Sequence, residues 1–527
     1  MKISPVVYLY ADPQTEGLFF SLLEDHFQVK SHQHSQTSLT YFDTFDWALL
    51  SKSCLLFATE QHLHLNKFTG EALAPPLFIS TRNSRFKSTE LPSSALGEAL
   101  FTSAPLRALL PLAHLTRNTR SLTCHDLNQK TVLRIKLETF ALDRDPSSPF
   151  IRTITLEPLR GYAASFSRVV EALSKIGIHP GQPHQHLALL AFKAAGHQPL
   201  GYSSEIELSL DPLSGTRDAA RQIHQHSLSI VRANLPGMLE DIDCEFLHDF
   251  RIAIRRARSA LSLLKGVYPP AEVITYKQHF SQMGRYTNLL RDLDVQLSQR
   301  SDYLSLLPPD LHPAAELFFE QIQLKREGAV RKMQEELAKE KIEPVLNQWE
   351  EFLLHPPPPN QDCPRALQPI GEVSRKLLAK QMARIYRQSA PIDQSTPDAE
   401  LHEIRIEFKK IRYLTEFFRS LYPPEALQTV LKRLRKLQNL LGEFNDLAVQ
   451  RTALGQRLQS PSLARHPDGL QIAAVIGALL QNFANQQTAL RQAVLSTFAS
   501  LRDPQMLRAV ETLWGSRAIP PGRGYEP

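Results

Sequence analysis

Cysteine is scarce in this 527-residue chain, which has only four of them. They are far apart in the sequence, and none belongs to a C-x-x-C pair. Disulfide-rich scaffolds and thiolate zinc sites need cysteines at short, repeated spacings. The sequence therefore predicts neither of them for Cys54, Cys124, Cys244 and Cys363.

Long hydrophobic runs are also absent. No stretch of about eighteen apolar residues occurs, so no membrane-spanning helix is predicted. The first residues, MKISPVVYLYADPQ, lack the extended apolar core of a secretory signal peptide. We therefore expect a soluble, cytoplasmic protein without a membrane partner.

Familiar catalytic and cofactor motifs are missing as well. The sequence has no Walker loop, no G-x-G-x-x-G and no G-x-S-x-G. The His-x-His pairs that begin at residues 32, 62 and 184 have no third ligand at a fixed spacing. We interpret these histidines as polar strand or loop residues and expect no metal site and no cofactor.

The excess of positive charge is small. The chain has 60 Lys and Arg against 54 Asp and Glu, a formal net charge of +6. Hydrophobic residues make up 42%, as in ordinary globular proteins, and the length predicts two or three domains. A binding site for a polyanion would therefore depend on local clusters of basic residues.

The hydrophobic pattern changes near residue 200. Before it, alternating apolar residues indicate strands at 5–10, 54–59, 131–138 and 151–156, with polar connections between them and a helix at 163–176. From about residue 212 onward, apolar residues recur at spacings of three and four, which predicts helices separated by proline-rich breaks. The pattern thus predicts an α+β protein with an antiparallel sheet domain at 1–200, a helical domain at 212–505 and a disordered tail at 517–527.

The helical part contains an internal repeat. Residues 247–270 read LHDFRIAIRRARSALSLLKGVYPP, and residues 401–424 read LHEIRIEFKKIRYLTEFFRSLYPP, an offset of 154. The same offset relates RDLDVQ at 291–296 to NDLAVQ at 445–450. A shared register of this length indicates a duplicated unit. We place its copies at about 212–354 and 370–505, with the proline run that begins at Pro356 between them.

Each copy of the repeated motif forms an amphipathic helix when successive residues are set about 100° apart. The basic side of the first helix carries His248, Arg251, Arg255 and Arg258, with Arg256 beside them. The basic side of the second carries His402, Arg405, Lys409 and Arg412. Like charges at i,i+4 repel by a few tenths of a kcal/mol, so we interpret these faces as the site of an anion.

Further basic residues follow in both copies. The second copy has the cluster Lys432, Arg433, Arg435 and Lys436, whereas the first has the sparser Lys277, Arg285 and Arg291. The alternative interpretation is a solvated or internally paired surface. Glu416 and three aspartates (Asp292, Asp294 and Asp446) are candidate partners, and Arg291 is the strongest candidate for a purely structural pair.

The two histidine blocks and LQNLLGEFNDLAVQ at 437–450 resemble the CHAD domain, the conserved-histidine α-helical domain, over about residues 212–505. The resemblance implies two pseudo-symmetric four-helix bundles with a basic groove that binds inorganic polyphosphate, and association with polyphosphate granules. It implicates the basic residues of both blocks, including Lys410. We include the cluster at 432–436 among the predicted polyphosphate-binding residues because it is basic.

The N-terminal half resembles the CYTH, or triphosphate-tunnel, fold in YFDTFDWALLSKSCLLF at 41–57 and RTITLEPLRGYAASFSRVVEAL at 152–173. Active members of that family hold metal and phosphate with E-x-E-x-K on the first strand, where this chain has PVVYLY at 5–10. The resemblance therefore implies a degenerate antiparallel β-tunnel without hydrolase activity, and we do not predict an enzyme.

Phosphate chemistry agrees with the basic faces. Arg can grip two phosphate oxygens, Lys acts as a point charge and a protonated His adds a donor. Tyr413 is the only aromatic residue interleaved with these charges, which argues against stacking on nucleobases. We therefore predict an inorganic polyphosphate-binding protein. A metal-dependent tripolyphosphatase, with the helical domain delivering substrate, and a nucleic-acid binder are the alternatives.

Overall fold

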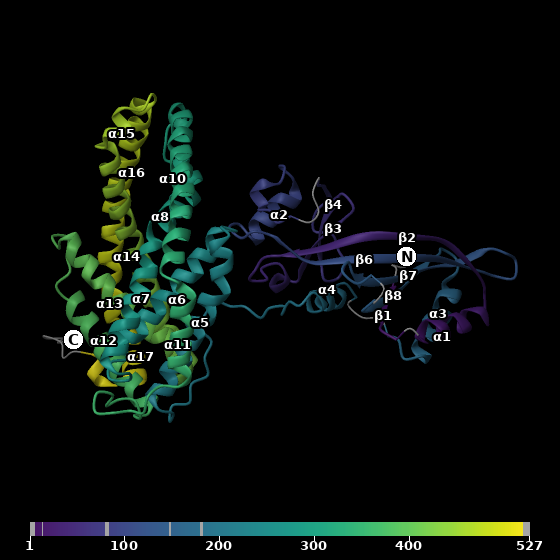
Figure 1. The fold of residues 1–527 in the computed structure, drawn as a ribbon, viewed down its shortest axis with the longest axis horizontal. Coiled ribbons are helices and arrows are strands. Elements are labelled where there is room, and N and C mark those ends of the chain that lie inside the picture. Colours follow the sequence, from purple (N-terminus) through teal and green to yellow (C-terminus); the bar gives the residue numbers. More distant parts are fainter. Residues whose placement is uncertain (1–5, 13, 80–83, 147–148, 180–182, 520–527) are drawn as a thin grey trace. The chain divides into compact units, whose positions relative to one another are not determined.

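The computed structural model describes residues 6–12, 14–79, 84–146, 149–179 and 183–519. The chain divides into two compact units, residues 1–203 and 204–527 (Figure 1). Among the described residues, no helix is long and apolar enough to cross a bilayer.

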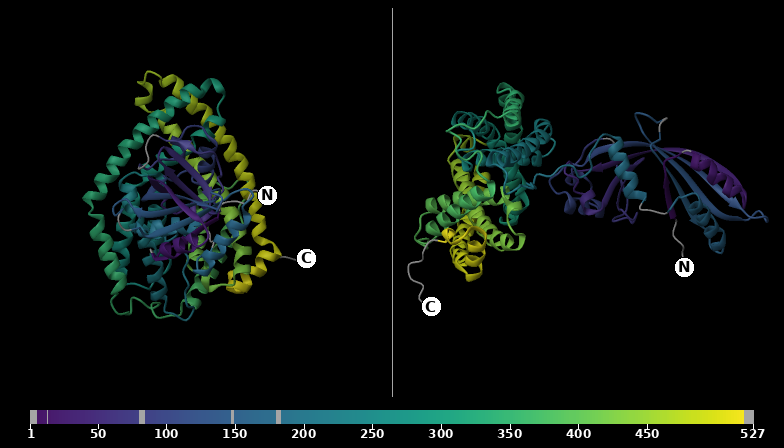
Figure 2. Two further views of the ribbon diagram at one scale, coloured as in Figure 1. Left: turned by 90° about the vertical axis from the view of Figure 1, so that its right-hand side faces the viewer. Right: turned by 90° about the horizontal axis from the view of Figure 1, so that it is seen from below.

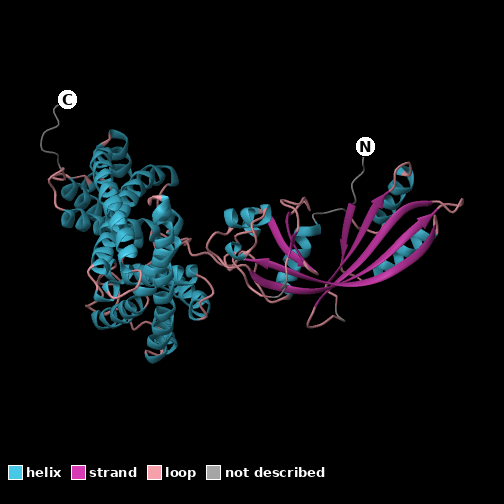
Figure 3. Cartoon of the chain, turned by 90° about the horizontal axis from the view of Figure 1, so that it is seen from above, coloured by secondary structure: helices cyan, strands magenta, loops and turns pink. Residues whose placement is uncertain are grey.

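An antiparallel sheet of eight strands forms the centre of the N-terminal unit (Figure 3). Its strand order is β1-β8-β7-β6-β2-β3-β4-β5. The strands are β1 (Val6–Tyr10), β2 (Gln28–Asp43), β3 (Cys54–Thr59), β4 (His62–Lys67), β5 (Leu77–Phe78), β6 (Leu110–His125), β7 (Thr131–Leu142) and β8 (Ile151–Pro158). The four predicted strands correspond to β1, β3, β7 and β8, except that residue 5 lies outside the described residues.

The two longest strands were not predicted. β2 and β6 each span 16 residues and pair with each other along most of their length. Their sequences are rich in Ser, Thr, His and Gln, and the interpretation of these segments as polar connections was wrong. Their backbone groups are satisfied by neighbouring strands, because β6 lies between β7 and β2.

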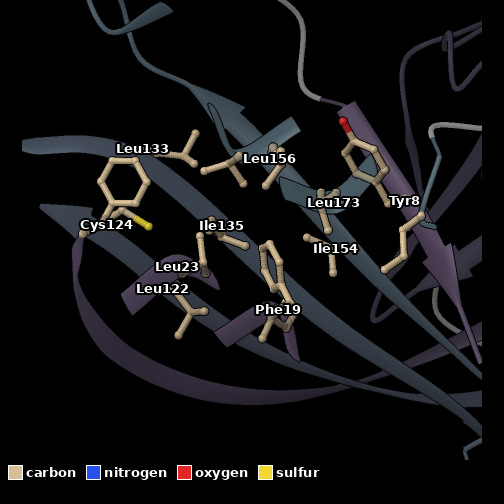
Figure 4. Packing of buried hydrophobic residues seen from close by; sticks show 14 of the residues in the cluster. Tyr8, Phe19, Leu23, Leu122, Cys124, Leu133, Ile135, Ile154, Leu156 and Leu173 are labelled. Carbon is tan, nitrogen blue, oxygen red and sulfur yellow. The ribbon is translucent and has the colours of Figure 1, made fainter. Parts of the chain in front are cut away.

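Helices pack against this sheet to form its core. The helices of the unit are α1 (Gln14–Glu24), α2 (Ala95–Ser103), α3 (Ala163–Lys175) and α4 (Pro183–Ala194). Phe19 of α1 and Leu173 of α3 are fully buried in one cluster with Leu122, Ile135 and Ile154 of the strands (Figure 4). The predicted helix at 163–176 corresponds to α3.

The C-terminal unit is helical, as predicted, and its helices pack side by side (Figure 2). The first repeat contains α5 (Thr216–Leu239), α6 (Cys244–Leu263), α7 (Pro270–Tyr286), α8 (Asn288–Ser298), α9 (Arg300–Ser305), α10 (His312–Lys339) and α11 (Ile342–Leu354). The second contains α12 (Ile370–Ser389), α13 (Asp398–Phe417), α14 (Pro424–Leu458), α15 (Pro461–Ala464), α16 (Gly469–Ala499) and α17 (Pro504–Trp514). The proline run lies between α11 and α12. A 3₁₀ turn at Ser516–Ala518 follows α17, and residues 520–527 of the tail expected to be disordered lie outside the described residues.

The repeat fixes the bounds of the two motif helices. Adding 154 to the bounds of α6 gives those of α13. The carboxylate of Asp243 caps α6 by accepting from the backbone N–H groups of Glu245 and Phe246, and proline begins α7 and α14. The predicted apolar faces are buried: Phe250, Ile254, Ala257, Leu261 and Leu264 in the first copy, and Ile404, Phe408, Ile411, Thr415 and Phe418 in the second. Hydrophobic burial therefore turns both basic faces away from the core.

The copies differ in their third helix. In the second repeat, α14 runs for 35 residues without a break. In the first repeat, Thr287 interrupts the equivalent segment and separates α7 from α8. The repeat offset places Leu441, a buried core residue of α14, at the position of Thr287. This difference changes the surroundings of the basic residues that face the segment.

Candidate functional site

The basic faces of α6 and α13 meet along a groove. Two cavities of about 300 and 400 Å³ lie along α6, α7, α13 and α14, and both are lined by Lys409. We call their combined lining the central groove. Its basic residues are Arg255, Arg258, Lys277, Arg405, Lys409, Lys410 and Arg412. Glu443 and Asp446 are the acidic residues of the lining among the described residues.

Several cations of the central groove have no internal partner. Within the described part of the chain, Arg255, Arg258, Lys277 and Lys409 make no side-chain hydrogen bond or ion pair. Burial and the charges of Arg405 and Arg255 together lower the pKa of Lys409 to about 8. The groove thus concentrates positive charge that the protein itself does not neutralise.

The other cations of the groove have weak or shared partners. Arg405 donates to Asp446 at 3.2 Å, but the Asp446 side chain is 66% exposed. His402, at the head of α13, is not among the residues that line the groove, and it lies 2.5 Å from the side-chain oxygen of Asn445. Lys410 donates to Glu407 at 2.8 Å. Burial lowers the pKa of Arg405, while Asp446 opposes the shift.

Arg251 is equivalent to Arg405 in the repeat, but its side chain holds neighbouring helices together. Its guanidinium donates to the carbonyl oxygen of Gly284 at 2.9 Å and to the hydroxyl of Thr287 at 2.6 Å, both at the break between α7 and α8. It also donates to Asn288 at 2.8 Å. The break offers acceptors that the continuous α14 lacks, so Arg251 satisfies backbone and side-chain oxygens instead of opening onto the groove.

Glu416 holds two further arginines of the motif helices. Its carboxylate forms ion pairs with Arg256 at 3.4 Å and with Arg412 at 3.2 Å, as the sequence suggested for one partner. Arg256 also donates to the backbone oxygen of Ser204, and its side chain is 11% exposed. Arg256 therefore lies outside the central groove, in a smaller cavity of about 160 Å³ that Arg412 and Arg435 also line.

The remaining predicted residues are dispersed. Arg433 contacts the segment between α16 and α17, where it pairs with Asp503 at 3.0 Å and donates to the backbone oxygen of Ser500 at 3.3 Å. Arg285 donates to Gln282 at 3.3 Å, and Lys432 and Lys436 are exposed on α14. His248 and Arg291 are half-buried, and Asp294 pairs with Arg326 rather than with Arg291. None of these residues lines the central groove.

A basic helix that was not predicted as part of the site lies beside the groove. α12 carries five exposed cations: Arg375, Lys376, Lys380, Arg384 and Arg387. A cavity of about 720 Å³ connects three of them to Lys277 and Lys410 of the central groove. The spacing of four from Lys376 to Lys380 and Arg384 was visible in the sequence, but it lies outside the repeated motif.

Several basic residues of the N-terminal unit make local contacts. Lys136 pairs across the sheet with Glu157 at 2.5 Å, and Lys52 donates to the backbone oxygen of Ser103 at 2.9 Å. Glu138 lies 3.7 Å from Arg117. Within the described ranges, no group of three His, Cys, Asp or Glu side chains is arranged to hold a metal ion.

Comparisons with known proteins find a family match within the helical unit. The family model of the CHAD domain matches residues 222–455, which confirms the resemblance stated from the sequence. The crystal structure of the CHAD domain from the plant Ricinus communis is similar at 24% identity, with a TM-score of 0.47, and the match covers 56% of this chain and 96% of that one. PptA from Streptomyces chartreusis is similar at 16% identity, with a TM-score of 0.42, and the match covers 54% of this chain and all of that one. No curated protein matches the chain. The antiparallel sheet of the N-terminal unit is consistent with a CYTH-like fold.

Proposed function

We propose that the CHAD domain at residues 222–455 of this chain binds inorganic polyphosphate in the central groove. The observation that carries the proposal is the set of unpaired cations on facing helices: Arg255 and Arg258 of α6 and Lys409 of α13. Like charges held close together and partly buried are unfavourable without a counter-charge. A chain of phosphates supplies closely spaced negative charges along the whole groove.

The composition of the groove favours phosphate over nucleobases. Tyr413 lines it but is buried, stacks on Phe417 at 17° and lies beneath the guanidinium of Arg412. Its ring is therefore occupied by protein groups. Proteins that bind single-stranded nucleic acid without sequence preference use aromatic faces on which bases stack. A groove of Arg and Lys without such a face suits a polyanion that has no bases.

Binding by the full chain to long-chain polyphosphate, measured at two salt concentrations, tests the proposal. We compare the wild type with Arg255→Gln/Lys409→Gln, because both side chains lack protein partners and their loss disturbs no ion pair. We expect wild-type affinity to fall as salt rises, since binding releases counterions. The double variant should bind roughly tenfold more weakly, with a shallower dependence on salt.

The matched control is Arg331→Gln/Lys332→Gln on α10, which removes the same two residue types from exposed positions outside the groove. Equal loss in both double variants would show a bulk charge effect and contradict the assigned site. RNA or DNA that displaces polyphosphate at equal charge concentration would instead favour the nucleic-acid alternative. Mg²⁺-dependent release of phosphate from tripolyphosphate would favour the hydrolase.

Affinity for long chains also predicts where the protein is found. We expect it in the cytoplasm, concentrated on polyphosphate granules in cells that store them. The groove variant Arg255→Gln/Lys409→Gln should be dispersed, whereas the control variant should remain on granules. Fluorescence microscopy of tagged proteins distinguishes the two distributions.

A further inference from the structure

The basic residues of α12 form a stripe that only the second repeat has. Lys376, Lys380, Arg384 and Arg387 follow one another at spacings of four, four and three, which places them on one side of the helix. All four are exposed. The repeat offset of 154 matches them with Gln222, His226, Ile230 and Ala233 of α5, and none of these is a Lys or Arg.

The stripe continues the central groove without a gap. A cavity of about 720 Å³ is lined by Lys277 and Lys410 of the central groove and by Lys376 and Lys380 of α12. The last two also line a cavity of about 790 Å³, which reaches Arg387 and Arg517. No Asp or Glu from the described ranges lines either cavity. We call the basic surface formed by Lys376, Lys380, Arg384 and Arg387 the α12 track.

Most charges of the α12 track remain available to a ligand. The side chains of Lys380 and Arg387 make no hydrogen bond or ion pair within the part of the chain that the structure describes. Lys376 pairs with Glu372 at 3.3 Å, and both side chains are mostly exposed, which makes the pair weak. Arg384 shares the buried carboxylate of Glu407 with Lys410.

Glu407 ties the two segments together. Burial raises the pKa of its carboxyl, but hydrogen bonds from Lys410 and Gln381 and the charge of Arg384 outweigh burial and leave the pKa below its ordinary value. The carboxylate therefore stays ionised and holds a cation from each segment at their junction. It neutralises one charge there, while the unpaired cations lie on both sides of it.

We infer that the α12 track extends the polyphosphate site in one direction and gives the protein a preference for long chains. The inference rests on the proposed function of the central groove. From Lys376 to Arg387 the track covers roughly 16 Å of helix axis. A tripolyphosphate is too short to fill both the central groove and the α12 track, whereas a long chain occupies both segments at once and gains affinity from the second as an intramolecular contact.

The test uses the full chain and two ligands, tripolyphosphate and polyphosphate of about a hundred phosphates. The track variant is Lys380→Gln/Arg387→Gln, and the control is again Arg331→Gln/Lys332→Gln. Glutamine keeps a good helix former at each exposed position. We expect the track variant to bind long chains roughly tenfold more weakly, with the slope of log affinity against log salt reduced by about one to two. Its affinity for tripolyphosphate should equal that of the wild type.

The outcomes separate this inference from the proposed function. If the track variant retains full affinity for long chains while Arg255→Gln/Lys409→Gln loses it, the central groove stands and the α12 track is overturned. Equal weakening of both ligands, or equal loss in the control, also overturns the track, because neither result depends on chain length. If the wild type binds neither ligand, the proposed function itself fails.

Discussion

The protonation of Lys409 depends on its surroundings in the central groove. Its pKa of about 8 reflects burial and the neighbouring charges of Arg405 and Arg255. A bound polyanion favours the ammonium form and therefore raises this pKa. Above about pH 8 the free protein must take up a proton at Lys409 in order to bind, so affinity should fall as the pH rises from about 7 to 9. Calorimetry at pH 8.5 in two buffers of different ionisation enthalpy measures this proton uptake directly.

The control for this pH dependence is Lys409→Met, which preserves the aliphatic bulk and removes the titrating group. It should bind polyphosphate more weakly than the wild type and take up less proton at pH 8.5. Undiminished proton uptake by Lys409→Met would assign the titration to another group and contradict the role given to Lys409.

The same shift predicts how Lys409 affects stability. The folded pKa lies below the ordinary value of 10.5, so between about pH 8 and 10.5 the unfolded chain binds more protons at this position. The charged side chain of Lys409 therefore destabilises the folded protein at neutral pH. This destabilisation decreases as the pH rises through that window. Without ligand, Lys409→Met should be more stable than the wild type at pH 7 by about 1 kcal/mol, measured by urea denaturation. A less stable variant would mean that the ammonium has a favourable partner.

Single residues also show the limit of prediction from a basic motif. The repeat correctly placed Arg256 on a basic helix, and the cluster on α14 did the same for Arg433. Their ion-pair partners, Glu416 and Asp503, come from segments far from each arginine in the sequence. Charge spacing within one helix contains no information about such partners. The unpaired cations could therefore be identified only from the folded structure.

At the scale of elements, the break between α7 and α8 makes the two repeats unequal. Arg251 stabilises the break by donating to Gly284 and Thr287, whereas its counterpart Arg405 meets an exposed carboxylate. Arg251→Ala leaves part-buried acceptors without a donor, so we expect a loss of about 2 kcal/mol in the free energy of unfolding. Arg405→Ala should lose well under 1 kcal/mol, because its partner is mostly solvated. Urea denaturation of both variants tests the contrast, and equal losses would contradict it.

Elements were predictable where one physical pattern dominates. The motif helices combine apolar residues at helical spacing with a repeat, and their buried faces follow from the sequence alone. β2 and β6 lack that signal because polar residues interrupt their apolar ones, and pairing with each other and with β3 and β7 shows them to be strands. α12 was predicted as part of a helical region, but its stripe escaped notice because the first repeat has no basic counterpart to draw attention to it.

At the scale of the whole molecule, the helical unit includes a segment that precedes its first helix, α5. Residues 204–210 precede α5 and contact helices of the same unit. The backbone oxygen of Glu205 accepts from His226 at 2.8 Å, and the backbone N–H of Leu210 donates to Ser420 at 3.1 Å. Ile206 and Leu210 are buried. The segment therefore belongs to the compact helical unit, which spans residues 204–527.

Two fragments test this boundary. Fragment 204–527 contains every residue of the central groove and the α12 track, so we expect it to bind long-chain polyphosphate with the affinity of the full chain. Fragment 212–527 lacks two buried apolar side chains and the hydrogen bonds of the segment, and it should be less stable by about 3 kcal/mol. Binding titration and urea denaturation of both fragments measure these effects. Equal stability of the two would show that residues 204–211 are dispensable, and weak binding by the stable longer fragment would mean that the first 203 residues contribute to the site.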